Sequence, residues 1–172
     1  MPGETRTETL QVAANGNRGT DQNAWLPIDR IVITSVTWGD GMVEGEPEPA
    51  ARARAVAAGS AQQLVRLVEL FRAAARAPQS HSISQLRADV AALPLAVSAQ
   101  EAADALAGMP EPRILSADSM RSSMLLGMQN AKNAALNDID EAAPRVRPEA
   151  YGDWLTAMVA KFGDWRARIV PR

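Results

Sequence analysis

A proline-rich acidic segment, residues 46–49 with the sequence Glu-Pro-Glu-Pro, divides the chain into two parts with different folding patterns. Proline fixes φ and lacks a backbone N–H, so it ends a strand but is tolerated in the first turn of a helix, where acidic side chains also favour the helix dipole. Before this segment β-branched residues follow strand patterns, and after it apolar residues repeat every three or four positions. This order predicts an α+β fold in which the β part comes first.

The first 48 residues predict a β segment of two to three antiparallel strands. Threonines alternate along residues 4–12, and residues 28–38 hold the densest run of β-branched residues. Gly39-Asp40-Gly41 favours a tight reversal, after which residues 42–44 are long enough to return as a short strand. A sheet this thin is stable only if a helix or further strands cover it, because its free edges pair readily with other strands.

Residues 49–172 predict an alanine-rich helical domain, a bundle of about five helices in which apolar residues keep helical spacing. Ser98 and Glu101 form a capping-box pattern that opens one of these helices. Gly59 lies inside the first helix, where it is either a weak point or a notch for close packing. The predicted helices cover about 50–77, 83–93, 98–108, 117–143 and the residues from 148 onward.

The composition excludes several classes of protein. The 172 residues include no cysteine and a single histidine, so disulfide frameworks, thiolate nucleophiles and the usual zinc sites are excluded. A net charge of -2 predicts no strong attraction to nucleic acid or to an anionic membrane. The apolar runs are far shorter than the roughly 20 residues of a transmembrane helix. We therefore expect a soluble chain with no transmembrane segment and no nucleic-acid partner.

Glycines and acidic residues around the predicted reversal offer a first candidate site. Gly39-Asp40-Gly41 with Gly45 imitates a dinucleotide-binding turn, but the spacing differs by one residue and the neighbouring carboxylates would repel a phosphate. This loop and the acidic cluster at 138–141 could attract calcium, yet neither matches a calcium-loop pattern. Both clusters are better explained as solvated surface, so we expect no cofactor and no metal.

Catalytic spacing is also missing elsewhere in the chain. His81 lies in a polar loop between two predicted helices, with no acid next to it in the sequence to orient the imidazole. Ser119, Ser122 and Ser123 lack the Gly-x-Ser-x-Gly pattern of a nucleophile elbow. No residue is therefore predicted to be catalytic.

The predicted helix over residues 50–77 is locally basic, because it contains five arginines and a single acidic residue, Glu69. We expect Glu69 to pair with Arg66 and Arg72 at three-residue spacing, and the other arginines to cover apolar surface or meet the acidic loops. This explanation is preferred to a nucleic-acid-binding face.

The stretch Ile33-Thr34-Ser35-Val36-Thr37-Trp38-Gly39-Asp40-Gly41-Met42-Val43-Glu44-Gly45-Glu46-Pro47, followed by alanines, Gly59 and Gln63-Leu64-Val65-Arg66, resembles a segment of uncharacterised bacterial hypothetical proteins. In those proteins the segment looks like the last strands of an immunoglobulin-like β domain joined to a helical tail. The resemblance implies no activity and no catalytic residue. It implies that residues 1–48 are the C-terminal part of a truncated β-sandwich and that Met1 is an internal start. The protein would then be extracytoplasmic if an export signal has been lost.

Two stripes of large apolar side chains and the single residue Trp38 are candidates for an interface. Methionines repeat every four residues along the fourth predicted helix, where thioether side chains could adapt to varied partners, although a core position is the commoner explanation. Tryptophans repeat on one side of the last helix, where a stripe of this kind more often closes a core. The candidate interface residues are Trp38, Met120, Met124, Met128, Trp154 and Trp165.

These observations favour a non-catalytic structural or protein-interaction module, whose partner is another protein or a second copy of the chain. The alternative is a small-ligand-binding or carboxylate-dependent hydrolytic protein. Its site would lie where residues 39–45 meet the first long helix, with Asp40 and Glu44 as the carboxylates.

Overall fold

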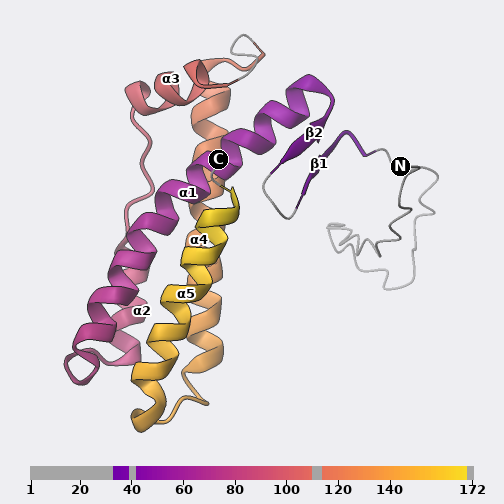
Figure 1. Cartoon of the computed structure of the whole chain (residues 1–172). Coiled ribbons are helices and arrows are strands. Elements are labelled where there is room, and N and C mark those ends of the chain that lie inside the picture. The colour runs from indigo at the N-terminus through magenta and orange to yellow at the C-terminus, as the bar shows by residue number, and fades with distance from the viewer. Residues whose placement is uncertain (1–32, 39–41, 110–113, 170–172) are drawn as a thin grey trace, which may run out of the picture. The chain divides into compact units, whose positions relative to one another are not determined.

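The computed structural model describes residues 33–38, 42–109 and 114–169, which belong to one compact unit of the chain. The predicted α+β class is confirmed, because a two-stranded antiparallel hairpin precedes five α-helices (Figure 1). The predicted strand at 4–12, the first part of the strand at 28–38 and the reversal at 39–41 lie outside the described residues. The elements are β1 (Ser35–Thr37), β2 (Val43–Gly45), α1 (Pro47–Arg76), η1 (Pro78–Ser80), α2 (Ile83–Ala92), α3 (Ala99–Ala107), α4 (Ala117–Ala142), η2 (Pro148–Ala150) and α5 (Tyr151–Ile169).

The hairpin is short and packs on α1 through one of its two faces. Thr37 lies opposite Val43 and Val36 lies opposite Glu44. Val43 is buried, whereas Thr37 opposite it is exposed, as are Val36 and Glu44 on the other face. The cover on the first face is therefore local to Val43. The Arg54 guanidinium on α1 donates a hydrogen bond to the Val43 carbonyl oxygen at 3.1 Å. α1 thus covers the face that carries Val43 and also binds the backbone of β2.

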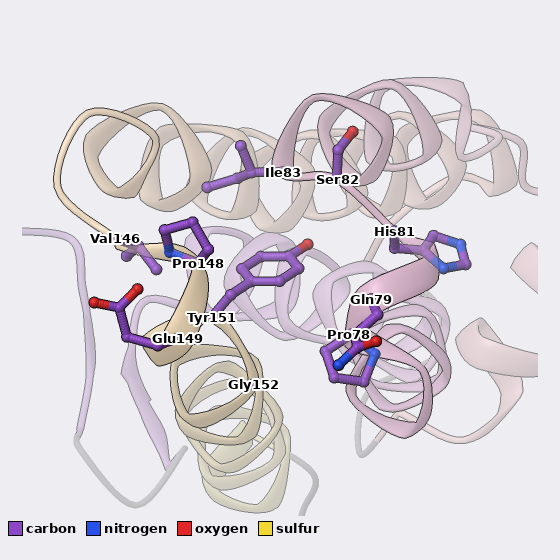
Figure 2. Close-up of a pocket in the computed structure, with 10 residues that line it drawn as sticks. All are labelled: Pro78, Gln79, His81, Ser82, Ile83, Val146, Pro148, Glu149, Tyr151 and Gly152. Carbon is purple, nitrogen blue, oxygen red and sulfur yellow. The ribbon is translucent and has the colours of Figure 1, made fainter.

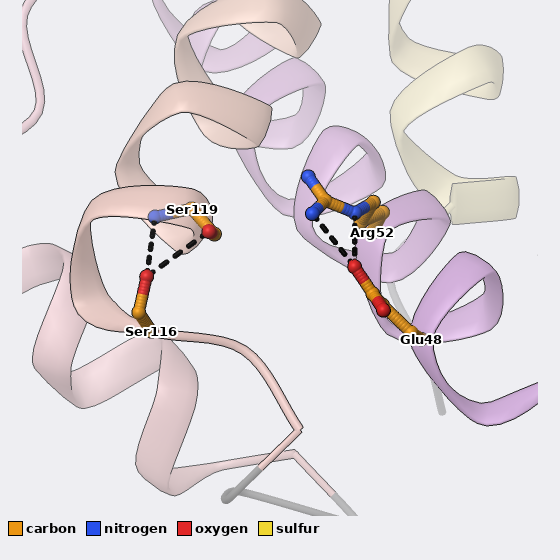
Figure 3. Close-up of polar contacts among 4 residues, drawn as sticks. All are labelled: Glu48, Arg52, Ser116 and Ser119. Carbon is orange, nitrogen blue, oxygen red and sulfur yellow. Dashed lines mark hydrogen bonds and ion pairs between the residues drawn. The ribbon is translucent and has the colours of Figure 1, made fainter.

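α1 begins inside the proline-rich acidic segment, at Pro47, a few residues before the predicted start at about residue 50. Glu46 is the N-cap with extended backbone angles, and Pro47 occupies the first turn, where its missing N–H costs nothing. Glu48 and Arg52, one helical turn apart, form an ion pair with an N···O distance of 2.7 Å (Figure 3). The helix ends at Arg76, ahead of Pro78.

Serine side chains cap three of the later helices. The Ser98 hydroxyl accepts a hydrogen bond from the Glu101 N–H at 3.1 Å, and the Glu101 carboxylate accepts one from the Ser98 N–H at 2.7 Å. This capping box confirms the predicted start of α3. Ser82 caps α2, and Ser116 caps α4 through the Ser119 N–H (Figure 3). The helix boundaries therefore follow from hydrogen bonds within a few residues.

The bundle contains two apolar cores, one on each side of the place where α1 crosses α4. The core around the N-terminal half of α4 is closed by α3. The core around the C-terminal half of α4 is closed by α2 and α5, which run alongside it (Figure 1). At the crossing the two backbones lie in direct contact. A Cβ added to Gly59 would overlap the Met124 carbonyl, and one added to Gly127 would overlap the Val56 carbonyl.

A hydrogen bond also joins the two helices at the crossing, since the Ser60 hydroxyl donates to the Gly127 carbonyl at 3.0 Å. Gly59 is therefore the close-packing notch that the sequence offered as one of two explanations.

Candidate functional site

The methionine stripe of α4 is part of the core. Met120, Met124 and Met128 are at most 1% exposed and pack with residues of α1 and α3. They fill the interior next to the glycine crossing, where flexible thioethers suit an irregular space. In this arrangement the three side chains are core rather than interface, which is the commoner of the two explanations for such a stripe.

The tryptophans of α5 also face inward. Trp154 and Trp165 are partly buried and pack against the core that α2 and α5 close. The Trp154 ring meets Phe71 edge to face at a centroid distance of 6.1 Å, and Trp165 lies 6.3 Å from Phe162. Their main contacts are thus internal, as expected for a stripe that closes a core.

Trp38 is the candidate interface residue that the structure leaves on an open surface. Trp38, Met42 and Val36 share the face of the hairpin that points away from α1, and their exposed fractions are 38%, 52% and 37%. Three large apolar side chains on one small exposed face are unusual for a surface that contacts only water. We call this set, with the outer edge of β1, the hairpin surface.

The backbone of β1 has an open outer edge. The Trp38 N–H donates to the Met42 carbonyl and the Thr34 carbonyl accepts from the Glu46 N–H, both at 2.8 Å. In an antiparallel pair the hydrogen-bonding direction alternates, so the N–H and C=O groups of Ser35 and Thr37 point away from β2. Among the described residues no third strand pairs with them. The outer edge of β2 differs from that of β1, because the Val43 carbonyl oxygen already accepts a hydrogen bond from the Arg54 guanidinium.

Charge further distinguishes the two edges of the hairpin. Residues 33–38 contain no charged side chain, and neither proline nor lysine interrupts them. Glu44, Glu46 and Glu48 lie along β2 and the start of α1, and all three are exposed. The outer edge of β1 therefore lacks charge and proline, two of the features that prevent strand pairing.

The alternative carboxylate site is not assembled in the described residues. Glu44 is exposed on the hairpin, and Asp40 lies outside the described residues. In the second acidic cluster, Asp138 binds Lys161 at 2.7 Å and Asp140 binds Arg87 at 2.6 Å. Hydrogen bonds from Arg87 lower the pKa of Asp140.

The arginines of α1 are bound differently from the prediction. Arg66 donates to the Gln63 side chain at 3.2 Å and to the Pro94 carbonyl at 3.0 Å. Among the residues that the structure describes, Glu69 forms no ion pair with Arg66 or Arg72, so that expectation was wrong. The reason is tertiary, since the chain after α2 brings a backbone acceptor to Arg66.

His81 has an acidic neighbour that its local sequence does not reveal. Its Nε2 lies 3.9 Å from an Asp89 oxygen, and the other Asp89 oxygen accepts a hydrogen bond from Gln85 at 2.8 Å. The His81 Nδ1 is buried and has no hydrogen-bond partner in the structure. One turn of η1 and the first two turns of α2 create this arrangement, which adjacency in the sequence could not show.

His81 also borders a pocket of about 630 Å³ between the η1–α2 segment and the η2–α5 segment (Figure 2). Figure 2 shows the Tyr151 ring in the middle of this pocket, with Glu149 on one side and His81 on the other. The sequence does not reveal this pocket, because its two halves are more than 60 residues apart in the chain. The lining residues are Pro78, Gln79, His81, Ser82, Ile83, Val146, Pro148, Glu149, Tyr151 and Gly152.

Comparisons with known proteins add no family to this description. No protein-family model, curated protein or solved structure matches the chain. None of the described helices combines the length and the apolar character that crossing a membrane requires.

Proposed function

We propose that this chain is a non-catalytic protein-interaction module that binds a second copy of itself through the hairpin surface. The observation that carries the proposal is the outer edge of β1, where Ser35 and Thr37 present backbone groups that no described strand satisfies. Backbone hydrogen bonds supply affinity in strand addition, and neighbouring side chains supply specificity. Trp38 and Val36 provide apolar side chains beside this edge.

A second copy fits this edge because β1 is compatible with its own antiparallel image. A two-fold axis at Ser35 would place Ile33 of one copy opposite Thr37 of the other, and each contact would occur twice. Residues 33–38 carry no charge, so the pairing brings no like charges together. Ile33 is 60% exposed and would gain an apolar contact.

The size of the hairpin supports the same proposal. Each strand has three residues, and α1 covers only the face that contains Val43. A pairing partner would convert two strands into a four-stranded sheet, which is closer to the size at which sheets are stable. The resemblance to the last strands of an immunoglobulin-like domain agrees with this, since such strands belong to a larger sheet.

The experiment is a concentration series of molar mass by sedimentation and light scattering, made on the full chain and on edge variants. We expect the mass to rise from monomer to dimer with concentration. Thr37→Pro removes an outward-pointing N–H, which an edge strand tolerates, and should weaken dimerisation at least tenfold. Thr37→Val retains the N–H and is the matched control.

A second variant, Ile33→Lys, places a charge on the same edge without changing the backbone and should also favour the monomer. Circular dichroism and melting temperature verify that each variant is folded. The proposal fails if the full chain is monomeric throughout the series, or if folded Thr37→Pro and Ile33→Lys dimerise as well as the original chain.

A further inference from the structure

The pocket beside His81 lies at the opposite end of α1 from the hairpin surface (Figures 1 and 2), and its chemistry points to a small ligand. Apolar side chains form much of its wall, among them Pro78, Ile83, Val146 and Pro148. Among the described lining residues Glu149 is the acidic side chain, and none is a lysine or an arginine. A pocket with this lining favours an uncharged molecule with an apolar body and offers no cation to hold an anion.

Tyr151 provides a hydrogen-bonding group in the middle of the pocket. The residue is 9% exposed, and its ring stacks on Trp154 at a centroid distance of 5.8 Å. The hydroxyl is buried and has no hydrogen-bond partner in the structure. Burial raises the pKa of Tyr151, so the phenol stays protonated at neutral pH and can donate. A buried hydroxyl without a partner costs free energy that an acceptor on a ligand would recover.

His81 borders the same pocket, but its imidazole points away from Tyr151 (Figure 2). Its Nδ1 is buried and has no hydrogen-bond partner in the structure. The polar group in the middle of the pocket is therefore the Tyr151 hydroxyl, and a ligand that satisfies it must contain a hydrogen-bond acceptor.

We propose that this pocket binds a small uncharged molecule that combines an apolar body with a carboxamide-type group, whose oxygen accepts a hydrogen bond from the Tyr151 hydroxyl. This hydroxyl is not in contact with bulk water, so the ligand reaches it by a small displacement of the wall. The wall consists of two three-residue turns, η1 and η2, and of helix ends, which move at lower cost than helix interiors. This site is independent of the dimerisation proposed above.

The direct experiment uses the fact that Tyr151 is the sole tyrosine. The full chain is labelled with 3-fluorotyrosine, which gives one ¹⁹F resonance inside the pocket, and is titrated with N-methylbenzamide. We expect a saturable shift of this resonance. Toluene, which lacks the amide, and benzoate, which is anionic, should bind at least several-fold more weakly.

Two variants test whether the shift reports this site. Tyr151→Phe retains the ring and should weaken N-methylbenzamide binding roughly 3- to 10-fold, measured by amide shifts of residues 79–83 and 149–152. Gly152→Leu extends a side chain from α5 toward Pro78, since a Cβ there lies 3.8 Å from the proline ring, and should abolish binding. Gly163→Leu, at a glycine with nothing within 4 Å of an added Cβ, is the matched control and should bind normally.

Each outcome decides for or against the proposal. A saturable shift that is lost in folded Gly152→Leu and retained in Gly163→Leu supports it. The proposal is overturned if N-methylbenzamide causes no saturable shift up to millimolar concentration, which would mean that the pocket holds only water. It is also overturned if toluene binds as tightly as the amide, or if Tyr151→Phe leaves the affinity unchanged.

Discussion

At the scale of single residues, two glycines decide how closely α1 and α4 approach. Gly59 and Gly127 each face a carbonyl of the opposite helix, and the Ser60 hydroxyl bonds the Gly127 carbonyl. Glycine lowers helix stability by about 1 kcal/mol relative to alanine. These two positions therefore lower the helix propensity of α1 and α4 but allow the two helices to make close contact. The neighbouring methionines are buried because the helices meet here.

Alanine at either crossing glycine should destabilise the protein although it improves helix propensity. The added methyl group meets backbone atoms, which cannot rotate away, so Gly59→Ala and Gly127→Ala should each cost about 1–3 kcal/mol in unfolding free energy. Gly163→Ala adds the same group in open space and should stabilise by about 0.5–1 kcal/mol. Urea denaturation measures all three. Equal effects at the three positions would contradict the crossing described above.

The Arg87–Asp140 pair should affect stability in acid. Arg87 donates two hydrogen bonds to Asp140, at 2.6 and 3.1 Å, and these lower the pKa of the carboxyl in the folded protein. A lowered folded-state pKa means that the stabilisation is complete above the unfolded-state pKa of Asp and is lost as the pH falls through the lowered pKa.

In Arg87→Gln the pKa of Asp140 should rise toward its ordinary value, and the acid limb of the stability curve should become shallower. Carboxyl-detected NMR titration and urea denaturation between about pH 2 and pH 6 measure the two effects. Lys161→Gln removes a different pair on the same helix and should leave the Asp140 titration unchanged. An unchanged Asp140 titration in Arg87→Gln would show that the pair does not form in solution.

At the scale of elements, α2 ends without the glycine that often terminates a helix. Its C-cap is Leu93, and the buried Lys132 of α4 donates to the carbonyls of Ala91 and Leu93 at 2.5 and 2.9 Å. A cation at the C-terminus of a helix also complements its dipole. One side chain of α4 thus replaces the local signal that α2 lacks.

Replacing Lys132 by methionine should destabilise the end of α2. Methionine retains the length and the apolar stem but donates no hydrogen bond to the carbonyls, so we expect a loss of about 1–3 kcal/mol. Hydrogen exchange should become faster at residues 90–93. Lys161→Met removes a partly exposed ion pair and should cost less than about 1 kcal/mol. A smaller effect at Lys132 than at Lys161 would argue against the capping role.

At the scale of the whole molecule, burial is uneven between the hairpin and the helices. In the described part of the hairpin Val43 is the buried apolar side chain, whereas α1, α4 and α5 share two cores. Local opening requires little free energy where few apolar contacts are lost. The hairpin should therefore open without unfolding of the bundle.

Hydrogen exchange with concentration as the variable tests both the uneven stability and the dimer. In dilute solution residues 35–38 and 42–45 should exchange faster than the buried turns of α1 and α4. At high concentration the amides of Ser35 and Thr37 should become protected, because they are the groups that a second β1 would bind. Slow exchange of the hairpin at every concentration would contradict the expected local opening.

The sequence by itself determined the helices, the capping box of α3 and the order of strands before helices. Each of these depends on groups a few residues apart, such as Ser98 with Glu101, or Pro47 after Glu46. Such local contacts do not depend on the tertiary fold. For Gly59 the sequence left two explanations, a weak point or a close-packing notch, and the contact with α4 decided between them.

Only the tertiary structure decided which apolar face is open and where a pocket forms. Met124 and Trp38 are both residue types that occur at interfaces. α1 and α3 cover Met124, whereas none of the described residues covers Trp38, so the exposed fractions of the two side chains differ. The pocket around Tyr151 is formed by two segments that lie far apart in the sequence, and neither the hydrophobic pattern nor helix propensity relates one segment to the other. Local sequence specifies what a segment becomes, whereas exposure and cavities depend on which distant segments pack against it.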